Sequence, residues 1–146
     1  MQKVVLKQNP EPNPLLDHKG RLLETLLPGV LSSFDVSIGV SHDLVEVSVQ
    51  PGDVADLCQT LKNHPETLFN YLTCLSVVDY VEYLQVVYHL YSTHNKHKAV
   101  VKANVPFEQP SLPSVISIWK GSDWYEREGH DLFGVVFESH PGSAPL

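Results

Sequence analysis

Three segments rich in valine, leucine and aromatic residues, joined by two short polar stretches, constrain the fold of this chain most strongly. They run over residues 68–80, 83–92 and 97–105. Such segments favour β-strands, and connections this short join neighbouring strands in opposite directions. The middle segment carries apolar side chains on both faces. We therefore predict a three-stranded antiparallel meander, with helices over one face and something else meeting the other.

The part of the chain before the meander is predicted to form a helix, a hairpin and a second helix. Leucines recur at helical spacing from residue 18 to Leu27, and Pro28 should end that helix. Residues 34–49 alternate as two strands around a turn at 41–43. A second amphipathic helix follows the possible N-cap Asp53 and ends near residues 64–65.

These elements predict an α+β fold with two layers. Helices pack on one face of a mixed, largely antiparallel sheet of about five strands. We expect a proline-rich extended arm over residues 1–17, one domain over residues 18–141, and a flexible tail over residues 142–146.

A second feature is a predicted helix near the carboxyl end of the chain. It should begin at Ser122 or Asp123, both favoured N-cap residues, and end at Gly134. Asp123, Arg127 and Asp131 recur at i, i+4 steps, so one guanidinium should bridge two carboxylates on one face. Large apolar residues fill much of the remaining helix surface, which is unusual for an ordinary surface helix.

Two interpretations of this helix compete. In the first, Glu126 and His130, with His140 as a third group, serve a small metal-dependent enzyme as metal ligands or as an acid–base pair. In the second, the charges neutralise one another, so that the helix face packs against the rest of the domain or against another protein. The pairing of opposite signs within the helix favours the second interpretation.

Composition excludes several classes of function. A formal net charge of −7 with ten Lys and Arg residues argues against nucleic-acid binding, which needs a basic face. Cys58 and Cys74 are too few for a four-cysteine metal or iron–sulfur site, and we expect both to be small buried hydrophobic residues. His94 and His97 fall in a predicted turn and are expected to be solvated. We find no phosphate-binding loop, apolar run of membrane-spanning length or secretory signal, and expect a chain that stays inside the cell.

One pattern goes beyond these general expectations. A tryptophan precedes a Glu-Arg-Glu triplet by two positions, an aspartate and a Phe-Gly pair follow within the same helix, and a His-Pro pair comes shortly afterwards. With this pattern, and with further stretches at residues 69–80, 87–90 and 113–119, the chain resembles the C subunit of NADH:quinone oxidoreductase, respiratory complex I, the 30 kDa subunit family. The resemblance covers about residues 20–141.

The resemblance implies a non-catalytic structural and assembly subunit of the peripheral arm, docked on the large D subunit near the quinone site and beside the iron–sulfur B subunit. It implies no cofactor in this chain, whereas FMN, iron–sulfur clusters and quinone belong to partner subunits. The complex would sit at the cytoplasmic face of the cell membrane, and this chain would reach the membrane only through it. Related subunits serve membrane-bound [NiFe] hydrogenases, with a nickel–iron centre in the partner, and coenzyme F420- or ferredoxin-linked dehydrogenases.

The resemblance also assigns folding and docking roles, none of them catalytic, to the residues of the motif. Two departures accompany it: Gly129 and His130 stand where bulkier residues are frequent, and residues 142–146 replace a tail that wraps the large subunit in relatives. These departures fit a divergent or hydrogenase-type complex at least as well as a standard respiratory one. The motif residues are Trp124, Glu126, Arg127, Glu128, Asp131, Phe133, Gly134, His140 and Pro141.

Overall fold

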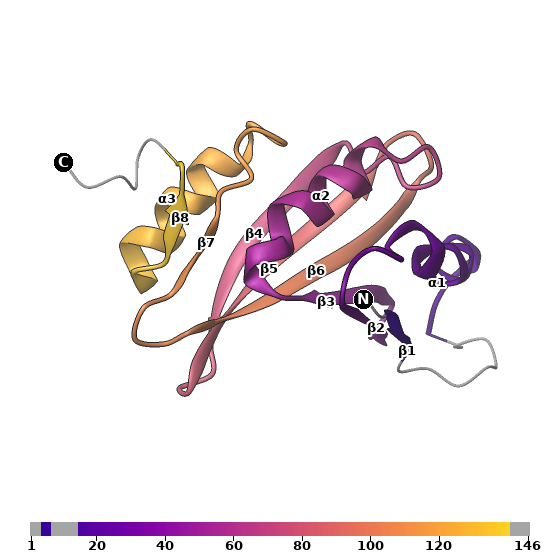
Figure 1. The fold of residues 1–146 in the computed structure, drawn as a ribbon. Helices are drawn as coiled ribbons and strands as arrows, with labels where there is room; N and C mark the ends of the chain where they lie inside the picture. The colour runs from indigo at the N-terminus through magenta and orange to yellow at the C-terminus, as the bar shows by residue number, and fades with distance from the viewer. Residues whose placement is uncertain (1–3, 7–14, 141–146) are drawn as a thin grey trace.

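The computed structural model describes residues 4–6 and 15–140 of the 146 residues, with the backbone alone described at 4–6. Its helices and strands are labelled in Figure 1. In order they are β1 (Val4–Leu6), α1 (His18–Val30), β2 (Val36–Ser41), β3 (Leu44–Val49), the 3-10 helix η1 (Pro51–Asp53), α2 (Val54–Asn63), β4 (Tyr71–Asp79), β5 (Tyr83–Ser92), β6 (His97–Pro106), β7 (Ser111–Pro113), α3 (Ser122–Phe133) and β8 (Val136–Glu138).

The main sheet is mixed and largely antiparallel, which confirms the predicted α+β class. Its strand order is β1-β2-β3-β6-β5-β4, with parallel pairs at β1–β2 and β3–β6 and antiparallel pairs elsewhere. The predicted meander and hairpin are both present. Strand β1 adds an edge strand within the region predicted as an arm. Residues 1–3 and 7–14 of that predicted arm, and the predicted tail at 142–146, lie outside the described residues.

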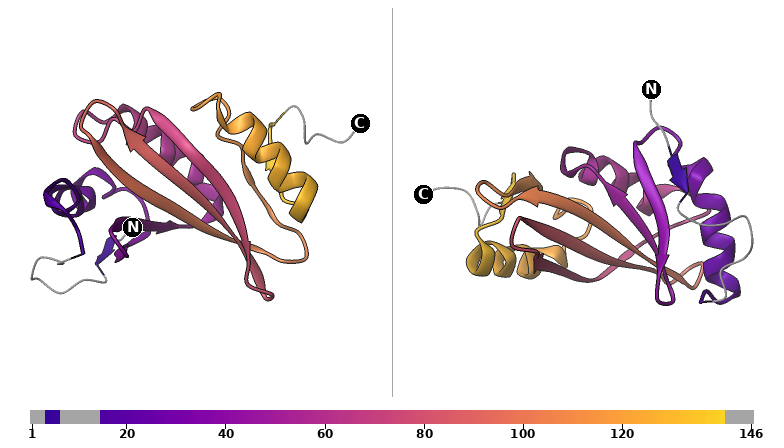
Figure 2. Two further views of the ribbon diagram at one scale, coloured as in Figure 1. Left: turned by 180° about the vertical axis from the view of Figure 1, so that it is seen from behind. Right: turned by 90° about the horizontal axis from the view of Figure 1, so that it is seen from below.

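The core lies between one face of the sheet and the helices. Leu84, Val86, Tyr88 and Leu90 of β5 point to this face, and the buried side chains of α1 and α2 pack against them. Seen from behind, strands β4 to β6 lie in front of α2 (Figure 2). Helices therefore cover one face, as predicted, whereas the expectation that something else meets the opposite face stays a prediction.

Helix α1 does not end where its sequence suggests. Asp17 is its N-cap and accepts a hydrogen bond from the backbone N–H of Gly20 at 2.7 Å. The helix then continues through Pro28 to Val30, so the predicted stop is wrong. The N–H of Leu31 donates to the carbonyl of Leu27 at 2.9 Å, and the Leu31 side chain is fully buried. Burial of Leu31 thus offsets the hydrogen bond that proline cannot make.

Two further expectations need correction. Asp53 is the N-cap residue of α2, but within the described residues its side chain makes no capping hydrogen bond. His97 is buried, whereas His94 is exposed as expected. The His97 Nε2–H donates to the Thr67 carbonyl at 2.7 Å, and its ring packs on Phe69. Thr67 lies thirty residues before His97 in the chain, so the residues of the turn give no sign of this hydrogen bond. The bond and the ring contact place His97 away from solvent.

The two cysteines differ in their surroundings. Cys58 on α2 is fully buried, as predicted, and burial raises the pKa of its thiol far above the ordinary value. Cys74 on β4 is only partly buried, because it points to the face of the sheet opposite α2. The prediction that both are buried is therefore correct for Cys58 alone.

Candidate functional site

Helix α3 connects two short strands that pair with each other in parallel. Strand β7 precedes it, β8 follows it, and Leu112 and Phe137 are partners in the register of the pair. Both of these side chains are buried, so the pair closes over one side of the helix. Strand β8 occupies a region for which the sequence indicated no element. The segment from β7 to β8 therefore forms a β–α–β unit that positions the predicted motif.

The ends of α3 follow the prediction closely. The N-cap residue is Gly121, one position before the predicted Ser122 or Asp123. Gly134 ends the helix with φ +73°, and its N–H donates to the carbonyl of His130 at 2.9 Å. This left-handed C-cap is the conformation that glycine adopts without a Cβ penalty.

Gly129 lets α3 lie close to its neighbours. A Cβ at this position would come within 3.3 Å of side-chain atoms of both Phe137 and Val77, tighter than ordinary contact. The hydroxyl of Tyr125 also donates to the carbonyl of Thr73 on β4 at 3.0 Å. Gly129 lowers the stability of the helix by about 1 kcal/mol relative to alanine. Because it has no Cβ, however, the helix can pack closely on β4 and β8.

Glu126 is the buried centre of the site, with 1% of its surface exposed. The Ser114 hydroxyl donates to Oε1 at 2.5 Å, and the N–H of Val115 donates to Oε2 at 2.8 Å. Burial raises the pKa of this carboxyl, and the bonds from Ser114 and Val115 oppose that rise. Glu126 therefore ties α3 to the segment that leads out of β7.

His140 joins the same cluster from the chain after β8. Its Nε2 lies 2.8 Å from Asp123 Oδ1 and 3.9 Å from Glu126 Oε1, and its side chain is fully buried. Arg127 Nε donates to the same Asp123 oxygen at 2.8 Å. The Arg127 guanidinium and His140 lower the pKa of Asp123. Asp123 therefore connects the exposed Arg127 of α3 with His140, which follows β8.

The predicted charge ladder is present in part. Arg127 pairs with Asp123, but within the described residues it makes no ion pair with Asp131. The expectation that one guanidinium bridges two carboxylates is therefore wrong. Instead one carboxylate, Asp123, binds two nitrogen-bearing side chains, Arg127 and His140.

Glu126 and His130 do not come together as a pair. His130 Nδ1–H donates to the backbone carbonyl of Val135 at 3.0 Å, whereas both oxygens of Glu126 accept bonds from Ser114 and Val115. Among residues 15–140 the structure shows no group of three or more His, Cys, Asp or Glu side chains arranged to hold a metal ion. The arrangement supports a structural cross-link at this site.

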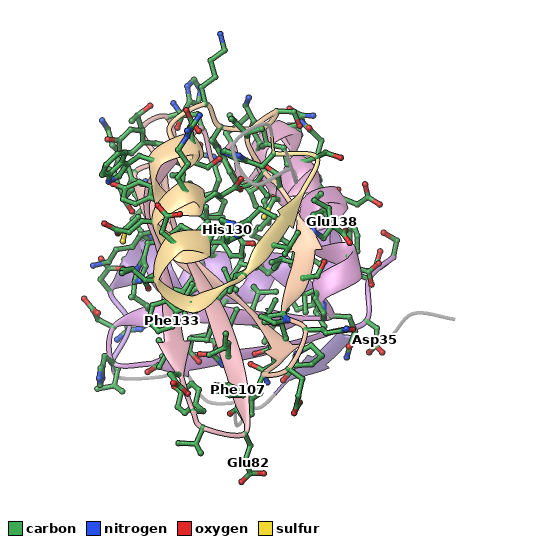
Figure 3. All side chains as sticks on the ribbon, turned by 90° about the vertical axis from the view of Figure 1, so that its left-hand side faces the viewer. Asp35, Glu82, Phe107, His130, Phe133 and Glu138 are labelled. Atoms are coloured by element: carbon green, nitrogen blue, oxygen red, sulfur yellow. The ribbon has the colours of Figure 1, made fainter. Side chains whose placement is uncertain are left out.

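The opposite face of α3 is open. Trp124 and Leu132 are each 69% exposed, and Phe133 is exposed more weakly. Arg127, Glu128 and Asp131 are exposed beside them. A groove of about 210 Å³ separates this face from β4. We call the exposed side chains of Trp124, Arg127, Glu128, Asp131, Leu132 and Phe133 the outer face of α3. Figure 3 labels Phe133, at the last turn of the helix.

The motif residues thus divide into two groups that the sequence did not separate. Glu126 and His140 are buried anchors, Gly134 is a helix cap, and the others lie on the outer face. Pro141 lies outside the described residues. Sequence reasoning missed the role of Ser114, although it lies in one of the resembling stretches. A buried glutamate needs hydrogen-bond donors for its carboxylate oxygens. A search for such donors in the segment before the helix could have indicated Ser114.

Comparison with known proteins decides the family. Residues 47–146 match the sequence profile of the respiratory-chain NADH dehydrogenase 30 kDa subunit. The chain belongs to this family. It is 33% identical over 121 residues to the NADH-quinone oxidoreductase C subunit 2 of Rhizobium meliloti, covering 79% of this chain and 66% of that protein. It is 38% identical over 100 residues to the NADH-quinone oxidoreductase C subunit of Roseiflexus castenholzii, covering 66% and 58%. The chain thus spans two-thirds or less of the length of these two relatives.

Two solved structures share the fold. A trypsin-resistant fragment of Nqo5 superimposes with a TM-score of 0.66 at 28% identity, covering 82% of this chain and 97% of the fragment. A chain of the membrane-bound sulfane sulfur reductase, an archaeal respiratory membrane complex, gives 0.69 at 25% identity, covering 80% and 71%. In the described part of this family member, no helix combines the length and the apolar character needed to cross a membrane.

Proposed function

We propose that this chain is a non-catalytic structural and assembly subunit of the peripheral arm of a membrane-associated NADH:quinone oxidoreductase, docked on the large D subunit near the quinone site. The observation that carries this proposal is the outer face of α3, where Trp124 and Leu132 are each 69% exposed. Exposed tryptophan and leucine beside charged groups are typical of a surface that another protein covers.

The buried side of α3 supports the proposal. A docking surface transmits binding energy best when it is rigid before the partner arrives. Glu126 fixes the helix to the segment after β7, and Asp123 fixes it to His140 after β8. Arg127 meets the partner already paired with Asp123, so enclosing its charge costs less than enclosing a lone guanidinium. These contacts support the proposal, because they would hold the docking surface rigid before the partner binds.

The proposal assigns the chemistry to other subunits. FMN, the iron–sulfur clusters and quinone would be held by partners, among them the iron–sulfur B subunit, and electron transfer and ion pumping would belong to the whole complex. This chain would be a peripheral component at the cytoplasmic face of the membrane, held there by its partners.

A second candidate function comes from the likeness to a chain of the sulfane sulfur reductase complex, with its TM-score of 0.69. In this alternative the chain is the equivalent subunit of a related membrane-bound complex, such as an [NiFe] hydrogenase or a coenzyme F420- or ferredoxin-linked dehydrogenase. The subunits that copurify distinguish the candidates. A flavin subunit that binds NADH supports the first, and a nickel-ligating large subunit supports the second.

The docking role is tested by Trp124→Ala and Arg127→Ala in the complex. A tagged chain is expressed in place of the native one, the complex is recovered from detergent-solubilised membranes, and its subunits and NADH:quinone activity are measured. Removal of a central interface tryptophan costs about 2 kcal/mol or more, which is about a thirtyfold loss of affinity. Recovery should therefore fall sharply for Trp124→Ala and in the same direction for Arg127→Ala.

A matched pair of leucine variants provides the control. Leu132 on the outer face is 69% exposed and Leu22 on α1 is 51% exposed. Leu132→Ala should reduce recovery, whereas Leu22→Ala should leave it unchanged, and both free chains should unfold at the same temperature as the wild type. Normal assembly and turnover with all of the outer-face variants would refute the docking role.

A further inference from the structure

The hairpin between β4 and β5 projects beyond the body of the protein (Figure 1). Its tip consists of Tyr80, Val81 and Glu82, between strands whose last pair is Asp79 and Leu84. The N–H of Val81 donates to Asp79 Oδ1 at 2.7 Å, and the N–H of Tyr80 donates to the carbonyl of Tyr83 at 3.0 Å. These bonds fix the shape of the tip.

Val81 occupies a conformation that disfavours its side chain. Its φ is +74°, in the left-handed region, and its side chain is 78% exposed. A β-branched residue is a genuine outlier there, because its Cβ substituents crowd the backbone. Glycine would adopt the same conformation without strain. The protein thus holds a branched apolar side chain in solvent against a conformational penalty, which is typical of a functional position.

Aromatic rings support the tip. Tyr80 and Tyr83 stack with ring centroids 5.1 Å apart, and Tyr80 is 47% exposed. Phe107 is also 47% exposed and follows Pro106, the register partner of Tyr83. Acidic residues surround these apolar groups in the sequence. They are Asp79, Glu82 and Glu108.

The tip continues the outer face of α3. In the view from the side of α3, Phe133, Phe107 and Glu82 lie one below the other from the helix to the end of the hairpin (Figure 3). The groove between α3 and β4 is lined in part by Val77 and Phe133, on the side of α3 that faces this hairpin. Val78, 37% exposed, lies between Val77 and the tip in the chain, and its side chain points to the opposite face of the sheet.

We propose that the tip of the β4–β5 hairpin is a second docking element, which inserts Val81 and Tyr80 into an apolar pocket with a basic rim on the same partner protein that covers the outer face of α3. The proposal rests on the proposed function, because it assigns the tip and α3 to one partner. The acidic residues around the tip require the basic rim, and the apolar side chains require the pocket.

Val81→Gly separates docking from folding. It relieves the left-handed strain, so the free chain should be at least as stable as the wild type in urea unfolding. It also removes the inserted side chain, so recovery of the complex from solubilised membranes should fall at least fivefold. The matched control is Lys96→Gly, another non-glycine turn residue with positive φ, at +61°. That variant should leave recovery unchanged. Wild-type recovery of Val81→Gly would overturn the proposal.

Photo-crosslinking in the intact complex identifies the partner. A benzoylphenylalanine at position 81 should crosslink to the same protein as one at position 124, whereas one at position 96 should not. A crosslink from position 124 without one from position 81 would overturn the tip proposal and leave the proposed function intact. Failure of both positions to reach any partner would overturn both.

Discussion

Replacement of Glu126 by alanine tests whether the buried carboxylate is a structural cross-link. The variant removes the acceptor of two hydrogen bonds, from the Ser114 hydroxyl at 2.5 Å and from the Val115 N–H at 2.8 Å. Hydrogen bonds to a charged group contribute about 1.5–3 kcal/mol each, so their loss amounts to about 3–6 kcal/mol. The variant also removes the free-energy cost of burying the carboxylate charge, so the net loss of stability is smaller than this sum.

We therefore expect Glu126→Ala to lower the free energy of unfolding by about 2–4 kcal/mol. For a chain of this size each kcal/mol shifts Tm by about 2–4 °C, so the melting temperature should fall by about 4–16 °C. Glu126→Gln keeps the shape and one acceptor, and should cost about 1 kcal/mol. Circular dichroism during heating and urea unfolding of the purified chain measure both values.

The pH dependence adds a second test. Burial raises the pKa of Glu126 above its ordinary value of 4.5. A raised pKa in the folded state means that this group stabilises most below 4.5 and loses that contribution as the pH rises through the folded value. Glutamine does not titrate, so the deficit of Glu126→Gln should be larger at about pH 4 than at about pH 8. A deficit that grows with pH would contradict the raised pKa of Glu126. An alanine variant as stable as the wild type would refute the cross-link.

Two further predictions concern positions outside this cluster. Burial lowers the pKa of His97 from its ordinary value of 6.5, so the folded state should lose stability as the pH falls below that value. Between about pH 7.5 and about pH 5, the urea midpoint of His97→Gln should therefore fall less than that of the wild type. An equal fall would contradict the assignment. Gly134→Ala places a Cβ at φ +73° and should cost about 1 kcal/mol, whereas Gly29→Ala in α1, with nothing within 4 Å, should not destabilise. Equal melting curves for the two alanine variants would show that the left-handed cap is unimportant.

Local patterns in the sequence predicted most of the elements. The meander, the hairpin and the end of α3 at Gly134 follow from strand alternation, turn residues and a glycine cap, all of which act over a few residues. The parallel pair β7–β8 could not be found in this way. Each strand has three residues, too few for alternation to be visible, and their pairing depends on the helix between them.

The buried face of α3 escaped prediction for a chemical reason. Its most buried residues are Ser122, Glu126 and Gly129, which share one side of the helix but are polar or small. Reasoning from hydrophobic periodicity identifies buried faces by apolar residues, so it assigns this face to solvent. The partners of Glu126 and Asp123 come from the segment after β7 and from the chain after β8, and their identity depends on the tertiary fold.

The parallel pairing of β3 with β6 has a consequence for synthesis on the ribosome. Strand β3 pairs with β2 on one side, but its other side can pair only after β6, which begins at His97, has been synthesised. While the intervening helix and two strands are being made, the nascent hairpin keeps an open hydrogen-bonding edge. The sheet therefore closes late in translation, when the last strand of the meander inserts between β3 and β5.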